Sequence, residues 1–191
     1  QQLMAAEREI IEEAYAGDII GVFDPGIFSI GDTLCTAAHK FQFDPIPTFA
    51  PEHFRRVRPL DTMKRKQFLK GMEQIAQEGA IQIFKTPYSG MEEVIVGVVG
   101  TLQFDVLEYR LKNEYGVDLY AEGLPYEYLR WLHHDGDEPL RADELTLPGD
   151  AMLVEDYRQN QLLLFASQWS INWTAERNKS VTLSEFGGAK F

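Results

Sequence analysis

The chain has 191 residues, of which 45% are hydrophobic and 25% are charged, a balance typical of folded globular proteins and not of disordered ones. Its formal net charge of −12 disfavours a general polyanion-binding protein, which needs clustered Lys and Arg. The single cysteine, Cys35, excludes an internal disulfide, and no apolar run approaches the roughly 20 residues that span a bilayer, so we expect a cytoplasmic protein with no membrane contact.

Two stretches near the start of the chain, residues 12–21 and 26–34, each combine a Gly-Asp turn with a β-branched run. This pattern predicts short antiparallel strands of a barrel. An isolated hairpin is at best marginally stable, so we expect residues 1–39 to be the C-terminal strands of a larger β-barrel domain, and the chain to begin partway through it. Three prolines predict a linker over residues 40–52.

The next segment predicts a strand followed by an amphipathic helix. Residues 54–58 alternate and stop at Pro59. Asp61 is the expected N-cap of the helix, and Gly79 its C-terminal stop. The apolar positions between them recur at helical spacing and predict a buried face: Met63, Phe68, Leu69, Met72, Ile75 and Ala76.

A second unit of the same kind follows. Residues 80–85 and 94–99 predict two strands joined by a turn at residues 86–90. Thr101 is the expected cap of a second helix, which ends at Gly116 and is followed by a strand at residues 117–122. The face predicted to be buried contains Leu102, Val106, Leu107, Leu111 and Tyr115. The order predicts an α+β, ferredoxin-like split βαβ core over residues 53–124, with both helices on one face of the sheet.

The C-terminal extension, residues 125–191, is read as part of the same α/β domain, which then covers residues 53–191. Residues 126–133, 151–156 and 161–168 predict strands, with an acidic, turn-rich stretch at residues 134–150. Residues 171–178 predict a short helix, and the last five residues are expected to fray.

Charge is distributed unevenly, because residues 51–70 contain seven Lys and Arg and two carboxylates, for a local net charge of +5. Three cations fall in the first turn of the first helix, where the helix dipole disfavours them. We therefore predict a surface for an anionic partner, with an ordinary solvated charge run as the alternative. The candidate interaction residues are Arg55, Arg56, Arg58, Lys64, Arg65 and Lys66.

Three kinds of chemical site were weighed and disfavoured. His133, His134, Asp135 and Asp137 are adequate metal ligands, but Gly136 and Pro139 indicate a solvated turn. A phosphate loop of the acylphosphatase kind, after the first strand, would need amides where Pro59 has none. Base stacking, as in RNA recognition motifs, needs aromatic residues on the third strand, and residues 92–99 contain none.

Residues 12–34, 49–57 and 97–107, taken together, resemble the bacterial class II peptide chain release factors, a family of translational GTPases. Residues 99–111 are also similar to the third domain of the related elongation factor G. The resemblance implies a parent with a GTP-binding domain, a β-barrel domain and an α/β domain. This chain is then expected to hold the end of the second domain and the whole third domain.

The resemblance also implies a noncatalytic role for this chain. No Gly-x-x-x-x-Gly-Lys-Ser/Thr phosphate loop occurs, and Val181 replaces the aspartate of the guanine-specifying Asn-Lys-x-Asp motif at Asn178 and Lys179. We expect no cofactor here, because GTP or GDP would bind the parent's missing domain, which would be a partner of this chain. The implied function is docking on ribosomal RNA and proteins, which indirectly helps to recycle class I release factors. The alternatives are the equivalent domain of another elongation-factor-like GTPase, or a free-standing ferredoxin-like enzyme or small-molecule sensor.

Overall fold

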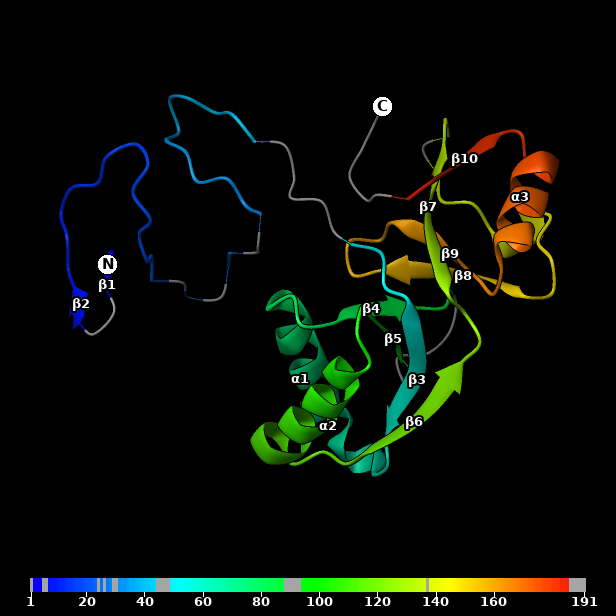
Figure 1. Ribbon diagram of the computed structural model, residues 1–191, viewed down its shortest axis with the longest axis horizontal. Helices are drawn as coiled ribbons and strands as arrows, with labels where there is room; N and C mark the ends of the chain where they lie inside the picture. Colours follow the sequence, from blue (N-terminus) through cyan, green and yellow to red (C-terminus); the bar gives the residue numbers. More distant parts are fainter. Residues whose placement is uncertain are drawn as a thin grey trace.

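A computed structural model describes residues 2–4, 7–23, 25, 27–28, 31–43, 49–87, 94–136 and 138–185. The N-terminal segment extends away from the α/β body (Figure 1). Its described residues contain a hairpin, β1 (Gln2–Met4) paired antiparallel with β2 (Glu7–Glu9). The strands predicted within residues 12–34 do not form in the described part of that range, apart from one bridge residue, Ile20. Barrel strands need hydrogen-bonded neighbours, and the hairpin provides none for them.

The first half of the body has the predicted order of elements. It consists of β3 (His53–Pro59), α1 (Arg65–Gln77), β4 (Gln82–Lys85), β5 (Val94–Val98), α2 (Leu102–Tyr115) and β6 (Leu119–Leu124). These four strands run in the order β4-β5-β3-β6, and each neighbouring pair is antiparallel. Both helices cover one face of this half-sheet (Figure 1), so the ferredoxin-like prediction is confirmed. The turn at residues 88–90 lies outside the described residues.

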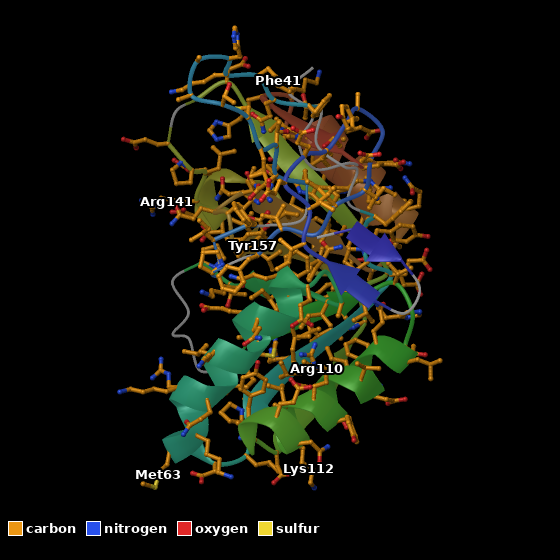
Figure 2. The ribbon with its side chains drawn as sticks, turned by 90° about the vertical axis from the view of Figure 1, so that its left-hand side faces the viewer. Phe41, Met63, Arg110, Lys112, Arg141 and Tyr157 are labelled. Carbon is orange, nitrogen blue, oxygen red and sulfur yellow. The ribbon has the colours of Figure 1, made fainter. Side chains whose placement is uncertain are left out.

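The first helix begins and ends where the sequence predicts, with one difference. Asp61 accepts a hydrogen bond from the Met63 amide at 2.9 Å, and Gly79 adopts a φ of 75° at the other end. The first turn is a 3-10 helix, η1 (Thr62–Lys64), which precedes α1. The prediction that Met63 is buried was wrong, because the tighter turn places its side chain in solvent at the end of the helical layer (Figure 2).

The second helix ends as predicted at Gly116, whose φ is 67°. Its start differs, because Thr101 makes no side-chain cap. The Gln103 carboxamide instead accepts hydrogen bonds from the amides of Val99 and Gly100, each at 3.0 Å. The predicted buried face was also partly wrong, because Phe104, Leu107 and Leu111 are buried whereas Leu102 and Val106 are exposed.

The two helices approach closely and are joined by an ion-pair network. A Cβ atom at Gly71 of α1 would lie 2.5 Å from the Leu111 side chain of α2, so only glycine fits there without a shift. Arg110 of α2 lies between the helices (Figure 2), and its guanidinium donates to Glu114 at 2.8 Å and to Glu78 at the end of α1. The hydrogen bond from Arg110 lowers the pKa of the Glu114 carboxyl. The hydrogen bonds to Glu114 and Glu78 raise the pKa of the Arg110 guanidinium.

This network makes the stability of the folded chain depend on pH. Because the pKa of Glu114 is lower in the folded chain, the pair contributes stability above the usual carboxyl value of 4.5 and loses it as the pH falls through the lowered pKa. We expect Glu114→Gln to lower the urea midpoint near pH 7, and this difference to shrink progressively as the pH falls below 4.5. A difference between the two chains that stays constant from neutral pH to acid would contradict this assignment.

The second half continues the sheet. Its elements are β7 (Tyr128–His134), η2 (Ala142–Glu144), β8 (Ala151–Asp156), β9 (Gln161–Phe165), α3 (Gln168–Arg177) and β10 (Val181–Ser184). The strand order β10-β7-β9-β8 joins the first half through the β8–β4 pair. The three strands predicted here are present, although β9 ends three residues early because α3 begins at its Ser167 cap. Strand β10 was not predicted from the sequence.

Three hydrophobic clusters divide the body into layers. One lies between α1, α2 and the first half-sheet. Another lies on the outer side of the second half-sheet, where α3 and the chain around Leu145 cover it. Between them, the helix-free face of the first half-sheet packs against the second, through Phe54, Phe84, Ile95, Leu129, Trp131, Val154, Leu162 and Leu164. The body is therefore a helix, sheet, sheet, helix stack in which each half covers the other.

This arrangement makes a prediction about the domain boundary. The residues of all three clusters lie at position 50 or beyond, and hydrogen bonds from Tyr15, Asp18 and Phe43 stay within the N-terminal segment. We therefore expect a chain that begins at residue 49 to fold alone and to melt within about 3 °C of the full chain. Circular dichroism measures this, and an unfolded or much less stable fragment would show that residues 1–48 belong to the same folding unit.

Candidate functional site

The six candidate cations lie on β3 and at the start of the first helix, in different surroundings. Arg55 is on the helix-covered side of β3, since it alternates with Phe54 on the other side. Its guanidinium lies 4.2 Å from the Phe104 ring centroid of α2 and 3.7 Å from the Glu108 carboxylate. Arg55 is therefore partly neutralised and is held against α2 by both contacts.

Arg56 and Arg58 belong to different surroundings. Arg56 pairs across to Glu122 of β6, with 3.3 Å between the guanidinium and the carboxylate. Arg58 lies opposite Tyr120, and its guanidinium is 4.5 Å from that ring centroid. Both contacts hold the arginine stems against the edge strand β6, so their charged groups lie at that edge of the sheet.

Lys64, Arg65 and Lys66 lie at the start of the first helix, which follows Arg58 after a short connection. Lys64 donates through Nζ to the Gly116 carbonyl, where its charge stabilises the C-terminal end of α2. Arg65 and Lys66 are exposed. Arg58 and the helix-start cations thus follow one another closely along the chain, while Arg55 lies toward α2 with Glu108 beside it.

Other candidate sites have structural roles. Among the described residues, no group of three or more His, Cys, Asp and Glu is placed to hold a metal ion. His133 bonds Ser184 at 2.9 Å, the His134 ring accepts from the Gly136 amide, and Asp137 lies outside the described residues. The buried Asn178 carboxamide bonds Thr146 and the Thr174 carbonyl, so it ties the end of α3 to a neighbouring loop.

A cavity of about 840 Å³ lies where the two halves meet, beside the start of α2. Tyr126 and Arg130, which line this cavity, were not among the residues predicted to form a site. Burial raises the pKa of the Tyr126 hydroxyl. Arg130 pairs with Glu185 at 2.8 Å. Both members of this pair belong to the second half, because Arg130 is on β7 and Glu185 directly follows β10.

Comparison with known proteins identifies the family. Residues 43–175 match the model of the class II release factor RF3, C-terminal domain, and residues 1–37 match elongation factor G domain 2. The chain belongs to the release factor 3 family. It is 49% identical over 178 residues to peptide chain release factor 3 of Symbiobacterium thermophilum, covering 93% of this chain and 33% of that protein. The corresponding protein of Listeria welshimeri is 42% identical over 183 residues, covering 96% of this chain and 34% of the relative.

The chain therefore corresponds to the C-terminal part of release factor 3 and spans about a third of the length of these relatives. The predicted resemblance is confirmed, and so is the α+β translation-factor fold. This family assignment replaces the alternative of an equivalent domain from another elongation-factor-like GTPase. No helix within the described ranges is long and apolar enough to cross a membrane.

Proposed function

We propose that this chain is a noncatalytic docking module of a cytoplasmic translation termination factor. It binds ribosomal RNA with the cations on the β3 and α1 flank, namely Arg55, Arg56, Arg58, Lys64, Arg65 and Lys66. By docking there, it helps the GTP-binding domain of the whole factor to recycle class I release factors. The module itself needs no nucleotide or metal.

The observation that carries the proposal is the concentration of cations in one part of an acidic chain. Residues 51–70 have a net charge of +5, whereas the whole chain has −12. Arg65 and Lys66 are exposed at the start of α1, a place where the helix dipole disfavours cations, so helix stability does not explain them. Their exposure leaves them accessible to phosphate groups, which bind proteins mainly through such charges.

The proposal predicts a charge-dependent affinity for ribosomes. Replacing Arg58, Arg65 and Lys66 by glutamate should weaken cosedimentation with 70S ribosomes and lower the slope of log affinity against log salt by about three. The matched control replaces three exposed cations of the other half, Arg158, Arg177 and Lys179, by glutamate. The control keeps the same net charge as the test variant, so it separates local contacts from overall repulsion.

Circular dichroism of each variant establishes that the fold is retained. Equal loss of affinity in both triple variants would mean that net charge alone governs binding. Unchanged cosedimentation of the test variant at low salt would reject this flank as the docking surface.

A further inference from the structure

The outer face of α2 differs from that of α1. Leu102, Val106 and Tyr109, at positions i, i+4 and i+7, are 76%, 49% and 69% exposed. This spacing places them together along the side of the helix opposite Phe104, Leu107 and Leu111. The outward positions of α1 are polar instead, with Lys66, Lys70 and Glu73 exposed. An apolar stripe on the outside of a soluble helix is a signature of a contact surface.

A groove of about 500 Å³ lies beside this stripe, between the connection into η1, helix α2 and the start of β6. Tyr109 lines it together with Leu60, which is also exposed. Four carboxylates line the same groove: Asp61, Asp105, Glu108 and Asp118. Two lysines also line it and do not balance the four carboxylates: Lys64 donates to the Gly116 carbonyl, and Lys112 pairs with Asp118 at 3.0 Å. Glu108 in turn contacts Arg55 at 3.7 Å. The groove is therefore both apolar and acidic.

The charge of the groove indicates which kind of molecule could bind there. RNA phosphates would meet an excess of carboxylates over lysines, four against two, and a second copy of this chain would bring a net charge of −12 to an acidic surface. A protein segment with Lys or Arg and two or three apolar side chains matches both properties. We propose that the stripe Leu102, Val106 and Tyr109, with the adjacent acidic groove, binds a basic amphipathic protein segment. This surface lies mainly on α2, and its groove adjoins the proposed RNA-binding cations through Lys64 and through Arg55, which contacts Glu108, so it extends the proposed function.

The test uses the full chain and a synthetic Leu-Lys peptide of about 18 residues, long enough to be helical. A peptide with the same lysines but serine in place of leucine is the charge-only control. In nuclear magnetic resonance titrations, the Leu-Lys peptide should shift amide signals of residues 99–113 and of Leu60. The double variant Leu102→Ser, Tyr109→Ser should bind it about tenfold more weakly or worse, because exposed anchor residues dominate such interfaces.

Trp169→Ser provides the matched variant, because Trp169 is 64% exposed on α3, on the opposite outer layer. It should leave the peptide affinity unchanged. Shifts centred on α3, equal binding of the serine peptide, or equal loss in both variants would overturn the proposal. So would sedimentation showing that the chain dimerises and that the double variant abolishes the dimer, because a second copy would then be the occupant. The charge-reversed ribosome variants leave the stripe itself intact, so the two proposals fail independently.

Discussion

Replacing Phe84 with alanine is expected to destabilise the whole α/β body by about 3 to 5 kcal/mol, the range for a buried Phe. Phe84 is on β4, where the first half-sheet meets β8 of the second. Its ring is almost completely buried in the middle cluster, with the Phe54 ring centroid 6.3 Å away. Because this cluster includes side chains from both halves, the loss should destabilise both together.

Urea unfolding, followed at once by tryptophan fluorescence and circular dichroism, measures this effect. The two signals should coincide in one transition, in the natural chain and in the variant. Phe49→Ala is the control, since Phe49 is three-quarters exposed, and it should change stability by less than about 0.5 kcal/mol. Two separate transitions, with only one moved by Phe84→Ala, would show that the halves fold independently.

The second large effect is expected at Gly97, in the middle of β5. A Cβ atom there would lie 2.7 Å from Cγ of Pro51 and 2.9 Å from Cε2 of Phe84, both parts of rigid rings. Gly97→Val should therefore destabilise the body by about 2 to 3 kcal/mol through overpacking, although valine favours strands. The variant is compared with the natural chain by urea unfolding.

Gly123→Val is the matched control, because Gly123 also lies in a strand, β6, and its Cβ would meet no atom within 4 Å. We expect it to be neutral or slightly stabilising, since valine restricts the unfolded chain and favours a strand. Equal destabilisation by both substitutions would mean that a general cost of replacing strand glycines, and not the close approach of Pro51 and Phe84, explains the effect.

Local signals in the sequence were sufficient to predict the order of helices and strands in the first half of the body. The Asp61 cap, the glycines at positions 79 and 116, and the alternation around β3 act over a few residues, so the chain order revealed the ferredoxin-like core. The resemblance to release factors came from segments that the family comparison also covers. Short-range capping and turn chemistry are what a sequence expresses most directly.

Features that depend on tertiary contacts were not predicted. Helical spacing placed Leu102 and Val106 in the core, because α2 has apolar residues on two faces and periodicity cannot tell which one is covered. The signal for the outer stripe in the sequence was that α2 has more apolar residues than one buried face needs. The packing of the second half on the helix-free sheet face joins residues that are distant in sequence, such as Phe54 and Leu164. The contacts of Arg55 with Glu108 and of Lys64 with the Gly116 carbonyl likewise form only in the folded structure, so the sequence did not reveal them.

Hydrogen exchange of the chain, free and bound to 70S ribosomes, most directly tests the central claim that the β3 and α1 flank docks on the ribosome. The account predicts slower exchange on binding for amides at the end of β3 and through η1 into the first turn of α1. The far layer, α3 and β10, should exchange at the same rate in both states. Protection confined to α3 and β10, with residues 58–68 unchanged, would contradict it.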